Sequence, residues 1–274
     1  MGWKDINNAE YLSVTQITML QRCPRQYEYR YVRGLKMPPT SSLILGTSVH
    51  KGCEINYATK YKTKKQAKLS DVLDAYSTAY DGADTTELTA EEKESYGKRK
   101  DNGYNMVKVH YERLAPGVQP INMPEEEFMA EIPGVKRPIL GYIDLYGKVF
   151  GTKAPVIIDN KTSKAKWTQW QVDCSIQLKV YKIVKAQQLG CKPEDIASSI
   201  DAILDQKVVS TQRMFADPVV DVDEITGCIA QLEQIIDRGL FYPTYNHQTC
   251  AWCGYAHICR PSIYKRREEC KNVQ

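Results

Sequence analysis

The sequence has no long hydrophobic run. No apolar stretch approaches the roughly 18 residues that a helix needs to cross a bilayer, and the first residues, Met1-Gly2-Trp3-Lys4-Asp5, lack the apolar core of a secretory signal peptide. We therefore expect no membrane span and an intracellular location, in the cytoplasm (of the host, if the protein is viral). The sequence also has no internal repeat and no low-complexity segment, which argues against repeat and fibrous architectures.

The net charge is also small. The 37 Lys and Arg residues against 33 Asp and Glu residues leave a formal charge of +4, which does not indicate a nucleic-acid partner by itself. The hydrophobic content of 42% is that of an ordinary globular protein. A chain of 274 residues is long enough to bury a sizeable core, in one large domain or two small ones.

Cysteine, in contrast, is abundant. The chain has nine cysteines, an odd number, and most of them are scattered. Both features argue against a disulfide framework and agree with a reducing compartment. The nine are Cys23, Cys53, Cys174, Cys191, Cys228, Cys250, Cys253, Cys259 and Cys270.

Three cysteines lie within ten residues near the C-terminus, and we call them the cysteine triplet: Cys250, Cys253 and Cys259. Three thiols this close together indicate a metal site. A zinc ion would take the triplet with His247, His257 or Cys23 as the fourth ligand. An iron–sulfur cluster takes four thiolates and so needs a distant fourth cysteine. With Cys23 in that role, the metal would join the N-terminal helix to the C-terminal segment and contribute to folding.

A second candidate site follows the run Val156-Ile157-Ile158. Its β-branched residues after Pro155 predict a short buried strand that ends in Asp159, Asn160 and Lys161. Alternate residues of a strand share a face, so Asp159 and Lys161 point the same way. This pair is either a simple salt bridge or a metal ligand beside a cation that serves a phosphate.

Asp144 favours the second interpretation. It lies in a predicted strand from Pro138 to Tyr146, which the turn-like segment from Gly147 to Pro155 joins to the Asp159 strand as a hairpin. Such a hairpin brings Asp144 and Asp159 within reach of one cation. Mg²⁺ and Mn²⁺ prefer hard oxygen ligands of this kind.

The N-terminal region interleaves aromatic and basic residues. The predicted helix from Pro24 to Arg33 suits a phosphate backbone and unstacked bases, and it suits equally an amphipathic surface helix with half-buried tyrosines. The residues concerned are Tyr27, Tyr29, Tyr31, Arg22, Arg25, Arg30 and Arg33.

The remaining pattern predicts a mixed α/β chain. Helices are expected from Leu45 to about Lys60, in the region from Asp71 to Leu114, from Lys166 to Leu189 before Gly190, and up to about Arg238; Pro38 to Ser42 reads as a linker. Further strands are expected from Glu127 to Ile132, from Ile200 to Leu204 and from Val208 to Phe215. Gln177 and Tyr181, spaced i and i+4, share one helix face.

Taken in order, these residues resemble the RecB-like branch of the PD-(D/E)XK nucleases, and within it the iron–sulfur exonucleases associated with CRISPR adaptation and the AddB nuclease domain. The likeness runs from about Leu12 to Pro261. Its motifs are Leu12-Ser13 with Cys23-Pro24 and Tyr27, Leu45-Gly46 through His50, Gly141-Tyr142-Ile143-Asp144, Asp159-Asn160-Lys161, Gln177-Leu178-Lys179-Val180-Tyr181 and the cysteine triplet.

The resemblance implies an α/β (α+β) fold with a central mixed sheet of the restriction-endonuclease type, its terminal segments joined by a cluster. It implies that His50, Asp144, Asp159 and the Asn160 carbonyl bind Mg²⁺ or Mn²⁺, and that Lys161 assists catalysis. Gln177 and Tyr181 would orient Lys161 or the nucleic acid. The triplet and Cys23 would bind a [4Fe–4S] cluster, with zinc as the alternative. Candidate phosphate contacts are Arg22, Arg25, Arg30, Lys164 and Lys166.

The function implied is that of a metal-dependent DNA nuclease, an exonuclease acting on single-stranded DNA or DNA ends. The alternative is a catalytically silent DNA-binding subunit of a recombination, repair or CRISPR-adaptation complex, and phage recombination, homo-oligomers and such partner proteins are all compatible with the resemblance. No phosphate-binding Gly-x-x-x-x-Gly-Lys-Ser/Thr loop is present, so we expect a stand-alone nuclease without a motor. The expected organisation is one domain, 1–274, in which 11–34 with 240–262 hold the cluster and 43–215 form the nuclease core.

Overall fold

A computed structural model describes residues 10–261, and Cys270 lies outside them. The described residues form two compact units. The larger unit takes 38–128 and 141–222, and the smaller takes 10–37, 129–140 and 223–261. None of the helices in the described part of the chain is long and apolar enough to cross a membrane.

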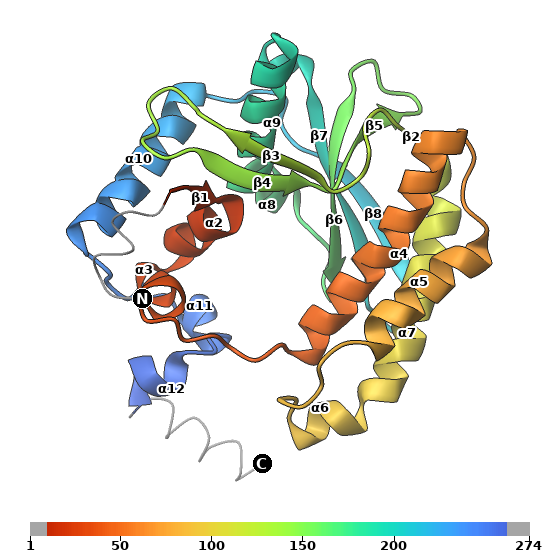
Figure 1. The fold of residues 1–274 in the computed structure, drawn as a ribbon, viewed down its shortest axis with the longest axis horizontal. Coiled ribbons are helices and arrows are strands. Elements are labelled where there is room, and N and C mark those ends of the chain that lie inside the picture. Colours follow the sequence, from red (N-terminus) through yellow and green to blue (C-terminus); the bar gives the residue numbers. More distant parts are fainter. Residues whose placement is uncertain (1–9, 262–274) are drawn as a thin grey trace. The chain divides into compact units, whose positions relative to one another are not determined.

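The larger unit contains a mixed five-stranded sheet in the order β2-β5-β6-β7-β8 (Figure 1). Strands β6 and β7 are parallel, while the other neighbours are antiparallel. The hairpin predicted around 147–155 is confirmed, because Leu145 pairs with Ile158 and Gly147 with Val156. The strands are β2 (Val118–Pro120), β5 (Leu145–Val149), β6 (Val156–Ser163), β7 (Ala197–Leu204) and β8 (Ser210–Phe215).

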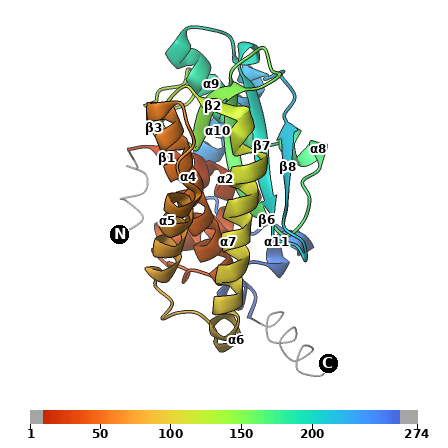
Figure 2. The same cartoon turned by 90° about the vertical axis from the view of Figure 1, so that its right-hand side faces the viewer.

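Helices cover both faces of this sheet. Ile203 of β7 belongs to the core built with α4, α5 and α7, whereas its neighbours Ala202 and Leu204 pack against residues of α8 and α9. Successive strand residues face opposite sides, so the two groups of helices lie on opposite faces, as Figure 2 shows for α7 and α8. The helices of this unit are α4 (Ser41–Thr63), α5 (Leu69–Asp81), α6 (Ala90–Glu94), α7 (Tyr96–Arg113), α8 (Gln169–Asp173) and α9 (Ile176–Leu189), with 3-10 helices at Ala115–Gly117 and Pro193–Asp195.

The smaller unit combines short helices with a three-stranded sheet in the order β1-β4-β3. The chain passes between the two units within β3 and β4. Its elements are β1 (Leu12–Ser13), α2 (Val14–Arg22), α3 (Pro24–Tyr27), a π-helix (Glu28–Val32), β3 (Glu126–Ala130), β4 (Ile139–Ile143), α10 (Val222–Arg238), α11 (His247–Ala251) and α12 (Ala256–Cys259).

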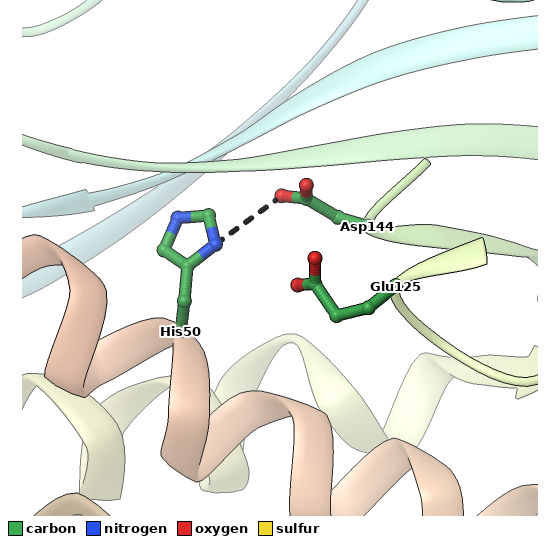
Figure 3. Close-up of side chains that lie close together, drawn as sticks. All are labelled: His50, Glu125 and Asp144. Atoms are coloured by element: carbon green, nitrogen blue, oxygen red, sulfur yellow. Dashed lines mark ion pairs between the residues drawn. The ribbon is translucent and has the colours of Figure 1, made fainter. Parts of the chain in front are cut away.

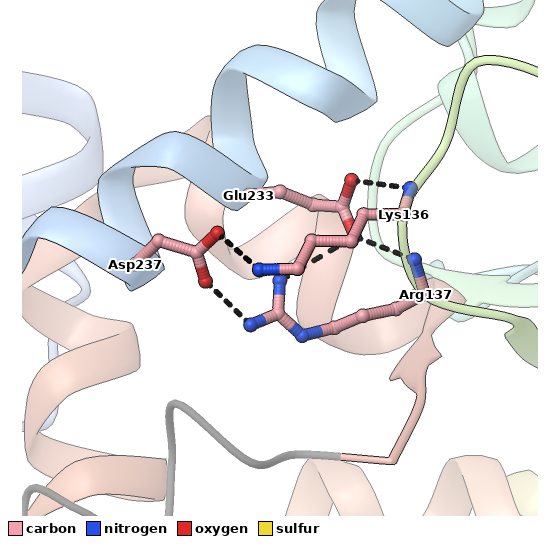
Figure 4. A network of polar contacts seen from close by, with 4 residues as sticks. All are labelled: Lys136, Arg137, Glu233 and Asp237. Carbon is pink, nitrogen blue, oxygen red and sulfur yellow. Dashed lines mark hydrogen bonds and ion pairs between the residues drawn. The ribbon is translucent and has the colours of Figure 1, made fainter.

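A buried polar network holds the turn before β4 against α10 (Figure 4). The backbone N–H groups of Lys136 and Arg137 donate to the Glu233 carboxylate at 2.8 and 2.9 Å. The Arg137 guanidinium, only 4% exposed, contacts Glu233 and donates to Asp237 at 2.5 Å. The buried charges are thus paired, as burial requires.

Several predicted elements differ in detail. The predicted helix from Lys166 to Leu189 is two helices, because Ser175 leaves the helical conformation and its side chain accepts from Leu178 N to cap α9. Ser41 and Ser42 are helical rather than part of a linker, since Thr40 caps α4 by accepting from Leu43 N.

The predicted strand from Pro138 to Tyr146 is also two strands, β4 and β5, with Asp144 between them. The Asp144 side chain accepts a hydrogen bond from Asn160 N at 2.8 Å, a donor at the edge of the β5–β6 ladder. The central mixed sheet flanked by helices agrees with the fold class predicted from the sequence.

One core residue makes stability depend on pH. His110 of α7 is 1% exposed, between Cys53 and Tyr57 of α4, each 3.4 Å from a ring nitrogen. Burial lowers the pKa of His110 to about 3, and Arg213 adds to the shift. Between pH 6.5 and about pH 3 the imidazole of His110 is protonated in the unfolded chain and neutral in the folded chain. His110 therefore lowers the free energy of unfolding by about 1.4 kcal/mol for each pH unit below 6.5.

We expect His110→Gln to remove this slope. Urea unfolding measures the difference in free energy of unfolding between the wild type and His110→Gln. This difference should fall by about 1.4 kcal/mol for each pH unit as the pH is lowered from about 6 to about 4. The exposed His247 offers a control, and His247→Gln should keep the wild-type slope. Parallel curves for the wild type and His110→Gln would contradict the assignment.

Candidate active site and cysteine cluster

The end of strand β6 holds an ion pair between the buried Asp159 and the half-buried Lys161. Lys161 Nζ lies 2.7 Å from Asp159 Oδ2, so the prediction that the two side chains share a face is confirmed. From α9, Gln177 Nε2 lies 3.1 Å from Asp159 Oδ1 and 2.9 Å from Tyr181 Oη. Gln177 and Tyr181 thus share a helix face, as predicted. The predicted role of Gln177 and Tyr181 in orienting Lys161 or the nucleic acid stays a prediction.

Burial and neighbouring charges together shift the pKa values of this pair. Burial raises the pKa of Asp159, which is fully inaccessible, although Lys161 opposes the shift. Burial alone would lower the pKa of Lys161, but the carboxylates of Asp159 and Asp144 outweigh it, so the pKa lies above its ordinary value. Lys161 is therefore an ammonium at neutral pH, a donor of hydrogen bonds and positive charge.

Three further side chains converge beside the pair (Figure 3). His50 of α4, Asp144 and Glu125 each offer one ligand atom, and these atoms all lie within 4.8 Å of one another. His50 Nδ1 is 3.5 Å from Asp144 Oδ2, the same oxygen that accepts from Asn160 N. An imidazole and two carboxylates within this distance could hold a single metal ion.

Glu125 is the residue that sequence reasoning missed. It precedes β3, its φ of 54° is unusual for a non-glycine residue, and its N–H donates to the Asp144 carbonyl at 3.0 Å. Burial, followed by the negative charge of Asp144, raises the pKa of Glu125 to about 7. The only sequence signal was the acidic run Glu125-Glu126-Glu127 before the strand, which does not say which carboxylate turns inward.

Helix α4 brings His50 to this place because Gly46 allows a close approach. A Cβ on Gly46 would lie 3.1 Å from Thr162 Oγ1 of β6. Gly46, His50, Glu125, Lys161 and Thr162 are among the residues that line an open pocket of about 520 Å³. The pocket thus gives a ligand access to both the His50 group and Lys161.

The donor set fits a divalent cation. Two carboxylates lie together, and burial followed by the negative charge of Asp144 raises the pKa of Glu125. Asp159 is not part of the three-residue group; its carboxylate contacts Lys161 and Gln177 instead. Asn160 is 4% exposed and contributes its N–H to Asp144.

The family model of the PD-(D/E)XK nuclease superfamily matches residues 11–260. The chain belongs to this superfamily. PD-(D/E)XK nucleases use divalent metal ions, and the chain has a possible acidic metal site of His50, Glu125 and Asp144. The assignment of Asp159, Asn160 and Lys161 to the acid-x-lysine motif stays a prediction.

One solved structure agrees with the fold. The chain resembles the crystal structure of a protein named "putative exonuclease" from Eubacterium rectale, with 16% identity, a TM-score of 0.55, and coverage of 93% of this chain and 89% of that one. A second crystal structure, of a protein called SSO0001, has 14% identity, a TM-score of 0.35, and coverage of 90% and 96%. A search of curated proteins gave no significant match.

In this PD-(D/E)XK chain the cysteine triplet meets Cys23. All four thiols line one cavity of about 80 Å³ in the smaller unit. Cys23 Sγ accepts from Thr244 N at 3.4 Å, and Cys253 Sγ accepts from Gln26 Nε2 at 3.3 Å. The N-terminal segment and the triplet therefore share one site, which local spacing alone could not decide.

The predicted phosphate contacts fall into different settings. Arg25 pairs with Glu28 at 2.7 Å, as does Arg33 at 2.6 Å, so the two arginines share one carboxylate. Arg22 and Arg30 are exposed. Lys164 lines a polar groove of about 650 Å³ in the larger unit, and Lys166 is exposed outside it. The other basic residues of this groove are Lys98, Arg99 and Lys207.

Proposed function

We propose that this PD-(D/E)XK protein is a Mg²⁺- or Mn²⁺-dependent deoxyribonuclease that acts as an exonuclease on single-stranded DNA or DNA ends. The observation that supports it is the meeting of His50, Glu125 and Asp144 beside the Asp159–Lys161 pair, where His50, Glu125 and Lys161 line one open pocket. His50, Asp144, Asp159 and the Asn160 carbonyl are the proposed ligands, with Glu125 added to them. The motif order supports the RecB-like branch as the proposed affiliation.

The side chains divide the work. A bound metal ion would polarise the scissile phosphate and lower the pKa of a water molecule. Asn160 N–H holds the Asp144 carboxylate, and Gln177 holds that of Asp159, so both ligands are oriented before the ion binds. Lys161, kept protonated by its carboxylate neighbours, cannot act as a base and instead donates charge to the phosphate oxygens.

The test is cleavage of an oligonucleotide labelled at its 5′ or 3′ end, with Mg²⁺ or Mn²⁺ and with neither. Products that shorten stepwise from one end support the exonuclease, whereas internal products would replace it by an endonuclease. A correctly folded preparation that cleaves nothing with either ion would overturn the proposal in favour of a silent DNA-binding subunit.

We further propose a [4Fe–4S] cluster on Cys23 and the cysteine triplet, in a cluster region formed by 11–34 with 240–262 beside a nuclease core at 43–215. Four cysteines that line one cavity support this ligand set. The cluster would serve folding, because its ligands come from both ends of the described chain.

Cys23→Ser should therefore lose most of its iron and the broad absorption near about 400 nm, in protein purified without oxygen. Cys191 is exposed and distant from the triplet in sequence, so Cys191→Ser should retain both signals. One zinc per chain in the wild type, or full iron in Cys23→Ser, would contradict this ligand set.

A further inference from the structure

The cysteine triplet presents an unusually exposed aromatic residue. Trp252, between Cys250 and Cys253, is 89% exposed, the largest value among the large hydrophobic side chains of the described residues. It follows α11 and takes no part in the core. An indole exposed to solvent is a flat apolar surface, which suits an incoming aromatic ring or base.

Trp252 borders an open pocket of about 420 Å³ within the smaller unit. Arg22, at the end of α2, and Arg30, in the π-helix, line the same pocket, and no acidic residue does. They differ in this from Arg25 and Arg33, both of which pair with Glu28. The pocket therefore combines an exposed indole with two cations whose charge no lining carboxylate offsets.

This combination matches one kind of ligand. Unpaired nucleotides offer a π-face to an aromatic ring and a phosphate to each arginine. Duplex DNA keeps its bases stacked inside the helix and offers only the phosphates. An apolar protein partner would leave the arginines and the neighbouring Gln248 and Thr249 poorly matched.

We propose that Trp252, Arg22 and Arg30 form a binding site for single-stranded DNA, in which Trp252 stacks on an unpaired base and the arginines contact the flanking phosphates. The proposal rests on the proposed nuclease function for the nature of the ligand, but it concerns residues outside the metal site. The pocket includes Cys253 and Gln26, which donates to the Cys253 thiol, so the cluster segment forms its wall.

The test is the affinity for a fluorescein-labelled 20-mer of thymidylate, measured by anisotropy in the full chain. Every variant also carries Lys161→Ala, and no divalent ion is added, so that the probe stays intact. Trp252→Ala should weaken binding by about 5- to 150-fold, the value of one lost base stack, and Trp252→Phe should restore most of it. Trp170, 77% exposed in α8, is the matched control, and Trp170→Ala should bind within about twofold of the parent.

The arginines are tested through salt. For single strands the slope of log K against log salt is negative, and each lost phosphate contact makes it shallower by about 0.7. The double variant Arg22→Gln with Arg30→Gln should therefore have a slope shallower by about 1.4. Arg238→Gln, an exposed arginine of the same unit outside the pocket, should leave the slope unchanged.

Three results would overturn the site. They are equal affinities of Trp252→Ala and Trp170→Ala for the single strand, a loss of affinity in Trp252→Ala that is as large for a blunt duplex as for the single strand, and an unchanged salt slope in the double arginine variant. Iron content and unfolding midpoint, measured on each variant, identify a loss caused by damage to the cluster segment, and Trp252→Phe then decides. Cleavage by the wild type is scored separately. If the wild type cleaves DNA but binding does not depend on Trp252, the proposed function stands and this site is refuted. If binding depends on Trp252 but the wild type cleaves nothing, the site stands and the proposed function is refuted.

Discussion

Asp144→Ala should lower the rate of DNA cleavage by a factor of at least about 100, while the protein stays folded. Asp144 belongs to the three-residue group and is the side chain that both His50 and Asn160 N–H contact. Its removal deletes a carboxylate ligand and leaves His50 without its orienting partner. The measurement is the initial rate of release of end label with Mn²⁺, together with circular dichroism and the unfolding midpoint.

Glu125 makes the experiment sharper. Glu125→Ala should also lower the rate, because its carboxylate lies in the same group. Glu127, two residues further on, is exposed, and Glu127→Ala should cleave like the wild type. Substantial activity in a folded, uncontaminated Asp144→Ala preparation would refute the site. Equal rates for Glu125→Ala and Glu127→Ala would remove Glu125 alone from the ligand list.

The second large effect concerns stability. Arg213→Met should lower the free energy of unfolding by about 3–5 kcal/mol, since it leaves a buried carboxylate without its partner. Asp201 of β7 is fully inaccessible and lies directly opposite Arg213 of β8. Arg213 Nε donates to Asp201 Oδ1 at 2.6 Å, and Nη2 donates to Oδ2, which makes the pair bidentate.

The matched variant replaces both partners. Asp201→Leu with Arg213→Met should recover most of the lost stability, because no charge then remains buried. Urea unfolding of the two single variants and the double variant completes the cycle. If the loss of unfolding free energy in the double variant equals the sum of the losses in the single variants, the two side chains do not act as a pair.

The sequence by itself determined what depends on spacing within one element. Strand alternation put Asp159 beside Lys161, and the helical repeat put Gln177 beside Tyr181. The run from Gly147 to Pro155 gave the β5–β6 hairpin. These relations depend on backbone geometry that is the same in any fold, so a short window of sequence is enough to read them.

Only the tertiary structure decided which distant groups meet. Nothing local distinguished Glu125 from Glu126 and Glu127, because the left-handed backbone at Glu125 and its N–H bond to the Asp144 carbonyl select it.

The position of Cys23 beside the cysteine triplet likewise depends on how the ends of the described chain close on each other. Such choices follow from packing and charge pairing summed over the whole unit, and no short window of sequence contains them.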